Sequence, residues 1–576
     1  MVSEKESSAK ASIRLENEPA EETSKLQPEI TPASAPPKPK TVDDFLKLGL
    51  YTLYAGITAE FVLFNMLSNM IYMVYSGAAP VVVSCGNYYA NTTDGDICQQ
   101  YNQWRSSGCK PVLDYQFLSF NVEYDYICGE AKYVKNSISV QMLGILIGTL
   151  VFGQMSDSFG RRTVANNLLS YISMSRHYLA QLSSVSNFQV LLITSIAAII
   201  LGAVGSFAGS LVSFTIWRCI TSFFAGGEII VLMVYLMEQV PKAHRLWIST
   251  VVTWSPNFII LAGVAYISYD WRTLARAISI ISLPVVPLLY FSHESPRWLF
   301  QKGKVDSLRK ALVRIRGGKK DEKEDAEMER MFQQAVVNAD MHENRQQHYI
   351  YHLFYTWELT LYTIVLSFGM FVTSITNYGL LFNMEKLSGS IYLNSAFFGL
   401  FRWSMNIVAG ALDYFCKSIG RKSIHFFAMA FIAAAVAIAF AVYTLKLNDW
   451  MFLVRYCALA AAAMCSQLYL TKTVVMVELY PTAVRNIATS FMGLLSRVGN
   501  ILAPQLFYLA DIWIPLPYLT MMLLALIDLF DFQIFIPETK GKPLKDHLPP
   551  PEECIWRRKK LSAEKQESSN AKENAV

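Results

Sequence analysis

The sequence predicts an all-α membrane protein with twelve transmembrane helices in two six-helix bundles. Three observations support this fold class. The chain of 576 residues is 53% hydrophobic and only 16% charged, whereas soluble proteins average about 25% charged residues. Its apolar residues gather in runs of about 20, the length that crosses the ~30 Å hydrocarbon core of a bilayer. The two halves of the chain also repeat the same short motifs.

Twelve apolar runs have the length of a membrane span. At 1.5 Å of rise per helical residue, about 20 residues cross the hydrocarbon core. A large soluble protein with buried helices does not account for so many runs of this length. The predicted spans are residues 47–76, 137–155, 190–209, 211–236, 247–268, 273–291, 356–382, 389–412, 423–444, 450–476, 487–509 and 513–536.

The segments outside the spans predict the domain order and the orientation. Residues 1–42 are rich in Pro, Ser, Glu and Lys, which predicts a disordered tail, and they lack the apolar core of a cleaved signal peptide. The central loop 292–355 carries twelve Lys or Arg residues, and basic loops of membrane proteins stay in the cytosol. We therefore expect this loop and both tails, 1–42 and 537–576, to be cytosolic. The bundles then occupy 43–291 and 356–536, and the net charge of +5 reflects topology rather than nucleic-acid binding.

The loop at 78–136 is expected on the extracellular side. It holds the one N-glycosylation sequon of the chain, at Asn91. An even set of cysteines beside a sequon is typical of a disulfide-bonded extracellular segment. Four cysteines allow three pairings, and the sequence does not choose among them. The four of the nine cysteines that lie in this loop are Cys85, Cys98, Cys109 and Cys128.

Three motifs occur once in each half of the chain. The first is "GQMSDSFGRR" at 153–162, which corresponds to "GALDYFCKSIGRK" at 410–422. The second pattern, E-x-x-P-x-x-x-R, is shared by "EQVPKAHR" and "ELYPTAVR". The third pair, "ESPRW" and "PETKG", closes the sixth and the twelfth span. Parallel repeats of this kind build transporters whose site lies between two bundles at the membrane midplane.

The spacing of the repeats differs between the halves. Arg161 and Glu238 are 77 residues apart, whereas Arg421 and Glu478 are 57 apart. The 20 extra residues fall in the polar segment 165–189. We expect this segment to be dispensable, either as a cytosolic insertion or as untranslated sequence retained in the reading frame.

Together these motifs resemble the major facilitator superfamily, and within it the organic ion (cation, anion and carnitine) transporters. The loop ends in "FNVEYDYIC", similar to the acidic run before the last loop cysteine of that branch. Residues 371–394 resemble its seventh-helix signature, with Asn377 where an aromatic residue is usual. The glutamine-rich seventh-helix motif of sugar porters is missing. The resemblance spans 43–545 without the surplus segment.

The resemblance implies alternating access, in which two bundles rock about a central cavity. The charged residues of the repeated motifs would then form cytosolic ties that break and reform as the cavity opens. The alternative is that these charges only fix topology at the membrane surface. The expected gating residues are Asp157, Arg161, Arg162, Glu238, Arg245, Asp413, Arg421, Glu478 and Arg485.

Charged residues within the predicted spans mark the candidate substrate site. An arginine at bilayer depth costs about 2.5–3.5 kcal/mol on insertion scales, so Arg497 in the run 488–507 requires a reason. Helical spacing places it on one face with Gly493, Asn500 and Pro504. The eighth span has a similar stripe around a second arginine, formed by Gly399, Arg402, Asn406, Gly410 and Asp413.

Further candidates for the site are Lys472, Glu60, Glu228 and the aromatic Tyr378. In the resembled family, cation carriers tend to have acidic residues where this chain has Arg402 and Arg497. Bases at both positions favour an anion, since a guanidinium binds a carboxylate or sulfate in bidentate fashion. Asn406 stands where anion carriers often have Lys. An alternative is that Glu60 or Glu228 neutralises the arginines internally, and for an aromatic residue taken singly we expect ordinary helix packing or interface anchoring before substrate contact.

The sequence therefore predicts a multi-pass plasma-membrane transporter of organic anions or zwitterions. The alternatives are an organic cation carrier that uses the two buried glutamates, and a non-transporting membrane sensor or scaffold. An enzyme is not expected, because no phosphate-binding loop, nucleophile motif or metal cluster is found. No cofactor is expected, the partners are the substrate and the lipid bilayer, and a co-transported or counter-transported ion is left open.

Overall fold

The computed structural model describes most of the chain between residues 46 and 555. The described residues are 46, 48–85, 88–89, 97–106, 110–158, 187–241, 253–292, 296–301, 305–315, 326–327, 329–330, 333, 349–415, 419–540 and 554–555. Their elements belong to one unit, Thr41–Val576.

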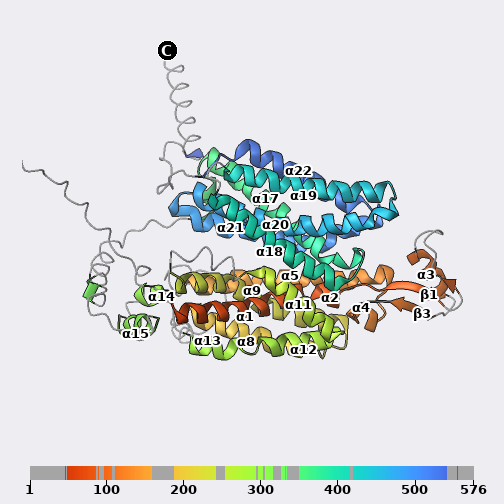
Figure 1. Cartoon of the computed structure of the whole chain (residues 1–576), viewed down its shortest axis with the longest axis horizontal. Helices are drawn as coiled ribbons and strands as arrows, with labels where there is room; N and C mark the ends of the chain where they lie inside the picture. Colours follow the sequence, from red (N-terminus) through yellow and green to blue (C-terminus); the bar gives the residue numbers. More distant parts are fainter. Residues whose placement is uncertain are drawn as a thin grey trace, which may run out of the picture. The chain divides into compact units, whose positions relative to one another are not determined.

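The first half forms a bundle in which each of the six predicted spans contains helix (Figure 1). Two of these spans are divided. The first runs as α1 and α2, and the sixth is split by Pro284, whose ring removes a backbone N–H donor between α12 and α13. The helices are α1 (Leu50–Ile71), α2 (Met73–Ser76), α5 (Ala131–Ser158), α8 (Asn187–Gly205), α9 (Leu211–Gln239), α11 (Trp254–Ser268), α12 (Trp271–Ser282) and α13 (Val285–Phe291).

The second half forms the other bundle and also contains its six predicted spans. Short 3₁₀ turns precede or follow several of them, and they are η5 (Ile350–Phe354), η6 (Met384–Lys386), η7 (Asn448–Trp450) and η8 (Phe507–Asp511). The long helices are α17 (Trp357–Phe382), α18 (Ile391–Phe415), α19 (Arg421–Thr444), α20 (Met451–Leu479), α21 (Thr482–Leu506) and α22 (Leu516–Phe535).

Length and apolar composition qualify eight of the described spans as membrane-crossing helices, with α8 and α11 as shorter apolar helices. The two remaining spans are α18 and α21. These helices hold Arg402 and Arg497 together with Asn406 and Asn500, and such polar residues lower their mean hydropathy. The twelve-helix prediction is confirmed, and the two spans that fall outside both of these groups carry Arg402 and Arg497.

Close helix packing holds each bundle together. In the first bundle α9 packs along both α5 and α8, and in the second α17 packs on α21 while α19 packs on α20 and α22. Glycines make the α5–α9 contact possible, because a Cβ at Gly148 would overlap the carbonyl of Phe223, and one at Gly226 would overlap that of Ile145. Small residues at such crossings let two helix backbones approach closely. The bundles meet mainly where α5 packs on α21 and α11 on α18.

The loop after α2 folds into a small domain. An antiparallel sheet with strand order β2-β1-β3 is formed by β1 (Val81–Cys85), β2 (Tyr88–Tyr89) and β3 (Pro111–Asp114). The helices α3 (Ile97–Ser106) and α4 (Phe120–Glu123) and the turn η2 (Cys128–Glu130) complete it. We call the end of the bundles that carries this domain the loop end. The opposite end, where α1 begins and α22 finishes, is the tail end.

One disulfide of the loop domain joins Cys98 to Cys128, and Cys85 is also disulfide-bonded. Asn91 and Cys109 lie outside the described residues. The predicted loop ended at residue 136, whereas α5 already begins at Ala131. The first turns of this helix read "AKYVKNS" and are too polar to belong to an apolar run.

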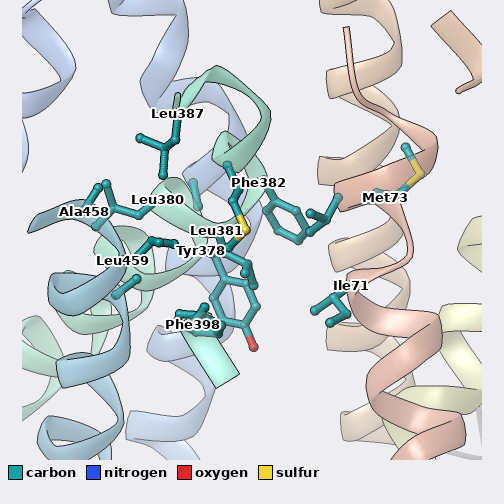
Figure 2. Close-up of a cluster of buried hydrophobic side chains, with 14 of the residues drawn as sticks. Ile71, Met73, Tyr378, Leu380, Leu381, Phe382, Leu387, Phe398, Ala458 and Leu459 are labelled. Atoms are coloured by element: carbon teal, nitrogen blue, oxygen red, sulfur yellow. The ribbon is translucent and has the colours of Figure 1, made fainter. Parts of the chain in front are cut away.

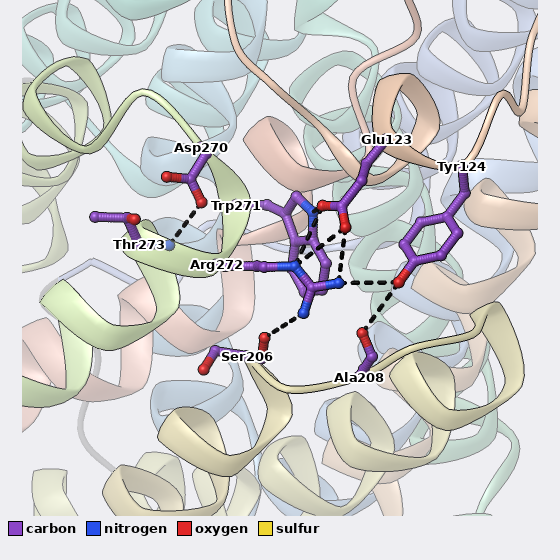
Figure 3. Close-up of polar contacts among 8 residues, drawn as sticks. All are labelled: Glu123, Tyr124, Ser206, Ala208, Asp270, Trp271, Arg272 and Thr273. Atoms are coloured by element: carbon purple, nitrogen blue, oxygen red, sulfur yellow. Dashed lines mark hydrogen bonds and ion pairs between the residues drawn. The ribbon is translucent and has the colours of Figure 1, made fainter.

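A polar and aromatic cluster anchors the loop domain on the first bundle (Figure 3). The carboxylate of Glu123 forms an ion pair with Arg272 at 2.8 Å and accepts a hydrogen bond from the indole N–H of Trp271 at 2.6 Å. Arg272 also donates to the hydroxyl of Tyr124 at 2.9 Å. Phe120 packs against Trp271, with 5.3 Å between ring centroids. These contacts hold the end of the loop on α12.

Two short helices lie in the central loop, α14 (Pro296–Gln301) and α15 (Val305–Ile315). The buried face of α15 is formed by Leu308, Leu312 and Ile315, which pack with Leu46 before α1. The segment predicted as a cytosolic loop therefore contains an amphipathic helix that is docked at the tail end of the first bundle.

Candidate functional site

Residues of both bundles meet in a buried cluster near the loop end (Figure 2). Ile71 and Met73, from the first bundle, lie opposite Tyr378 and Phe382 of α17 (Figure 2). The Tyr378 hydroxyl contacts the sulfur of Met70 at 3.6 Å. Tyr378 therefore lies at the bundle interface, consistent with its predicted place beside the site.

Arg402 of α18 and Arg497 of α21 both act electrostatically on the hydroxyl of Tyr378. They also share a second aromatic neighbour, Tyr469 of α20. The guanidinium of Arg402 lies 6.0 Å from the ring of Phe258, which belongs to the first bundle. The structure therefore brings together two arginines and two tyrosines that are far apart in the sequence.

Neither arginine has a counter-charge among the described residues. Within that part of the chain, Arg402 and Arg497 form no hydrogen bond and no ion pair, and the buried Nε of Arg402 has no partner. Both side chains are half-buried. Gly410 and Gly493, on the same helix faces, have no heavy atom within 4 Å of an added Cβ. The α18 and α21 stripes thus border open space at these two glycines, whereas Gly399 of the α18 stripe packs closely against Phe258 and Ser255 of the first bundle.

Hydrogen bonds fix the side chains around the arginines. The hydroxyl of Tyr469 donates to Ser374 at 2.7 Å, and Ser374 is 2.6 Å from Ser496 of α21. The side-chain oxygen of Asn406 accepts hydrogen bonds from Ser466, at 2.8 Å, and from Gln467 of α20. Asn406 lies on the same stripe as Arg402, as predicted, but its side-chain oxygen is occupied by α20.

Lys472 does not lie beside the arginines in an open site. Its ammonium forms a 2.6 Å ion pair with Asp528 of α22 and donates to the carbonyl of Gly369 and the hydroxyl of Thr373. Lys472 and Asp528 have no exposed surface. The imidazole of His425 lies 3.8 Å from the same carboxylate. This geometry goes against the expected substrate contact by Lys472, because its donors are already used inside the second bundle.

The two glutamates of the first bundle pair with amides rather than with arginines. Glu60 accepts a hydrogen bond from Asn257 at 2.8 Å, and Glu228 accepts one from Asn65 at 2.8 Å. One carboxylate oxygen of each is buried without a partner among the described residues. No described Lys or Arg lies within ion-pair distance of either carboxylate. Internal neutralisation of Arg402 and Arg497 by these glutamates is therefore not seen.

A further arginine within a span, Arg218 of α9, was not predicted as a site residue and is only 4% exposed. Its guanidinium donates to the side chain and the backbone carbonyl of Asn69 and lies 4.3 Å from the ring of Tyr72. Asn69 in turn donates to Asn65, the partner of Glu228. Arg218 could have been identified from the sequence in the same way as Arg497, because it is a charged residue within a predicted span, 211–236.

A buried ion pair between the bundles was also missed. Lys135 of α5 lies 2.8 Å from Glu385 of η6, and each side chain is only 8% exposed. Lys135 also donates to Asn383 at 2.6 Å. No sequence signal was available, because both charges fall near the ends of predicted spans and their pairing depends on how the bundles meet.

Cross-bundle contacts gather in the loop-end half. On the side of α5 they involve Lys132, Asn136 and Ser139, and on the side of α21 and η8 they involve Gln505 and Asp511. Lys132 forms an ion pair with Asp511 at 2.5 Å, and Gln505 donates to Asn136 and Ser139 at 3.0 Å. The ion pair between Lys135 and Glu385 lies in the same half.

The repeated motif of the second bundle forms a network at the tail end. Arg421 pairs with Glu478 at 3.4 Å, and Thr539 donates to the same carboxylate at 2.5 Å. Arg485 donates to the backbone carbonyl of Tyr480. These three predicted gating residues therefore make ties within one bundle. Glu238 and the backbone of Asp157 and Asp413 are described, whereas Arg161, Arg162, Arg245 and residues 165–186 lie outside the described part.

Glu538 completes this network by capping α19. Partial burial raises the pKa of Glu538, but hydrogen bonds from the backbone N–H groups of Lys540, Lys422, Arg421 and Thr539 outweigh it, so the pKa lies below its usual value. Two of these donors belong to the first turn of α19, where a helix attracts an anion.

Comparisons with known proteins agree with this architecture. A sequence model described as "Sugar (and other) transporter" matches residues 92–547. The Organic cation transporter protein of Drosophila melanogaster is 27% identical over 473 residues, covering 80% of this chain and 79% of that protein. Solute carrier family 22 member 6-B of Xenopus laevis is 26% identical over 470 residues, covering 79% and 78%.

Solved structures of the xylose transporter XylE from E. coli share the fold. The inward open conformation has a TM-score of 0.57 at 16% identity, and the match covers 85% of this chain and 97% of XylE. XylE is described as a major facilitator superfamily protein. Because the sequence model matches most of the chain and the twelve-helix fold is shared, this chain belongs to the sugar (and other) transporter family of multi-pass membrane transporters and is not an enzyme.

Proposed function

We propose that this protein carries small organic ions across the plasma membrane by alternating access, and that its substrates are organic anions or zwitterions. The observation that carries the proposal is the pair Arg402 and Arg497, two half-buried guanidinium groups without a carboxylate partner among the described residues. Charged groups at membrane depth mark substrate pathways, and an arginine fork suits a carboxylate or sulfate.

The proposed substrate site lies between the bundles. Arg402 and Arg497 bind the anionic group, Tyr378 stacks or hydrogen-bonds the organic part, and Asn406 holds the Arg402 stripe against α20. Support comes from the electrostatic coupling of both arginines to Tyr378 and from the open space beside Gly410 and Gly493 on their helix faces. Lys472 is left out, because its buried pair with Asp528 gives it a structural role.

The orientation follows the basic loops and the disulfide-bonded loop domain. We place the loop end outside the cell, with Asn91 glycosylated, and both termini in the cytosol. The polar contacts between the bundles at the loop end, such as Lys132 with Asp511, then correspond to a closed extracellular side. Arg421, Glu478 and Arg485 would adjust as the tail end opens and closes, together with the corresponding charges of the first bundle.

An organic cation is the second candidate substrate. Glu60 and Glu228 of the first bundle each have one buried carboxylate oxygen without a partner among the described residues, and such an oxygen could accept a cationic group. The Drosophila relative is named an organic cation transporter. The two candidates place the charged end of the substrate against opposite bundles.

Uptake of three labelled probes into cells expressing the chain separates these candidates. The probes are an aromatic carboxylate, a quaternary ammonium and a zwitterion with both groups. The anion proposal expects carboxylate or zwitterion uptake that falls in Arg402→Gln and Arg497→Gln. Arg276→Gln is the matched control, because Arg276 is an exposed arginine of α12 that donates to Ser206. If only the quaternary ammonium is taken up, and its uptake is the same in Arg402→Gln and Arg497→Gln as in the unchanged protein, the substrate is an organic cation.

A further inference from the structure

The loop segment 115–124 is fixed to the first bundle. Leu118 exchanges backbone hydrogen bonds with Tyr269 and Trp271, at 3.0 and 3.1 Å. The side-chain amide of Asn121 donates to the carbonyl of Gly77 at 2.9 Å, just beyond α2. With the Glu123 cluster of Figure 3, these bonds make the segment a rigid extension of the first bundle.

From this segment the side chain of Gln116 reaches the second bundle. The amide of Gln116 donates to the carbonyl of Gly389 at 3.0 Å, and its oxygen accepts the backbone N–H of Ile391 at 2.8 Å. The Tyr392 hydroxyl donates to the backbone carbonyl of Gln116 at 2.8 Å. Ile391 is the first residue of α18, so its N–H has no acceptor within the helix. Gln116 thus caps a helix that belongs to the opposite bundle.

The turn that receives Gln116 has a defined shape. Gly389 has a φ of +86°, a conformation that favours glycine, and a side chain there would overlap the guanidinium of Arg455. Arg455 is itself fixed by a 2.6 Å hydrogen bond to Asn394 of α18. The carbonyl of Gly389 and the N–H of Ile391 therefore lie where one planar amide can bond both.

A second cross-bundle contact lies a few residues earlier in the same segment of the second bundle. Lys135 of α5 bonds Asn383 and pairs with Glu385, and the three side chains are almost fully buried. Segment 383–392 therefore receives one neutral and one charged contact from the first bundle. Both would be broken by separating the bundles at the loop end.

We propose that segment 383–392 is the loop-end gate of the transport cycle, with Gln116 and Lys135 as its positioning residues. The Gln116 contact detaches whenever the substrate site opens toward the loop end, so its strength sets the fraction of protein that is open on that side. The loop domain then takes part in opening and closing the gate, through Gln116. The proposal rests on the alternating access proposed above.

Cysteine accessibility tests this gate. The reporter is Ile71→Cys, because Ile71 is 1% exposed and lies opposite α17 at the loop end (Figure 2). A membrane-impermeant thiol reagent is applied to intact cells, and the rate of modification is measured in the reporter chain with and without the further change Gln116→Ala. The matched control is Asn448→Ala, which removes an exposed amide at the same end within the second bundle. A second reporter, Leu274→Cys, is buried in the first bundle and should not respond.

Gln116→Ala is expected to speed modification of the reporter about ten-fold, whereas Asn448→Ala leaves it unchanged. Ten-fold corresponds to about 1.4 kcal/mol, and the variant loses the two side-chain hydrogen bonds of Gln116. The apparent KM for substrate supplied outside should fall with the larger open fraction, without an equal change in kcat. A merely structural role would lower both surface amount and kcat and would leave the modification rate per molecule unchanged.

Modification rates that are equal in Gln116→Ala and Asn448→Ala would overturn the gate. If Gln116→Ala does not reach the surface, Tyr392→Phe replaces it, since it removes one hydroxyl and should speed modification about three-fold. Absence of uptake for every probe, together with faster modification in these variants, would reject the proposed transport but support the gate. Reporter modification only in inverted vesicles would reject the orientation, and the variants would then be compared there.

Discussion

Arg497→Gln is expected to weaken uptake of a carboxylate substrate far more than it weakens folding. Arg497 has no ion pair to lose among the described residues, and its half-buried side chain borders the open stripe that contains Gly493. A hydrogen bond to a charged group contributes about 1.5–3 kcal/mol. Because the side chain is partly exposed, we take the lower half of that range, about 2 kcal/mol, or a roughly 30-fold loss in kcat/KM at 1.4 kcal/mol per ten-fold change.

Two further substitutions at position 497, to Lys and to Asp, distinguish the effect of the positive charge from that of the planar guanidinium group. Arg497→Lys keeps the charge without the planar fork, so KM for a carboxylate should rise while transport persists. Arg497→Asp reverses the charge and should abolish anion uptake. The assay is initial-rate uptake of the labelled carboxylate, normalised to surface protein by biotinylation, with Arg276→Gln as the control.

Normal anion uptake by an Arg497→Asp protein that reaches the surface would refute this reasoning. Arg497 would then be a structural residue, and the anion proposal would have to be given up. Charge reversal at Glu60 or Glu228 in that background would show which glutamate had been its partner in another conformation.

Three further predictions follow from the buried and capping charges. Asp528→Asn should destabilise the protein by about 3–5 kcal/mol, since it leaves Lys472 charged and unpaired in the core. Thermal unfolding in detergent measures this loss of stability. The double variant Lys472→Met with Asp528→Leu should recover most of it. Glu538→Gln should make the free energy of unfolding less dependent on pH in the acid range. Its lowered pKa means that the stabilisation is present above the unfolded value of about 4.3 and is lost as the pH falls through the folded value, and unfolding temperatures between pH 3 and 7 test this. Asn91→Gln should increase electrophoretic mobility, and glycosidase treatment should abolish the difference; equal mobility before treatment would contradict the extracellular loop.

The twelve spans could be predicted because each depends on its own composition. A run of about 20 apolar residues must cross a bilayer as a helix, whatever its neighbours are. Two features were not predicted: the polar first turns of α5 from Ala131 belong to its helix, and the sixth run contains a break at Pro284. The surplus at 165–189 was recognised by comparing the halves, and the structure leaves that prediction untested.

The candidate site could be predicted only in part, for a related reason. Arg402 and Arg497 were identified because a charge at bilayer depth is costly in any arrangement. Their partners, or the lack of them, depend on which helices pack together. Lys472 looked equivalent to them in sequence, yet Asp528, 56 residues later, occupies its ammonium. A single sequence does not show that α20 and α22 place these two side chains in contact.

The structure thus separates Lys472 and Lys135 from Arg402 and Arg497, a distinction that the sequence could not make. Lys472 and Lys135 have carboxylate partners, and removing either partner would leave a buried charge uncompensated. Arg402 and Arg497 have none among the described residues, although the cost of placing them in a membrane is comparable. The free-energy cost of a charge in the membrane that no internal contact offsets is best explained by a substrate that binds to the charge and dissociates from it. These two charges, on α18 and α21, are the basis on which we propose a transported anion rather than a structural role for the arginines.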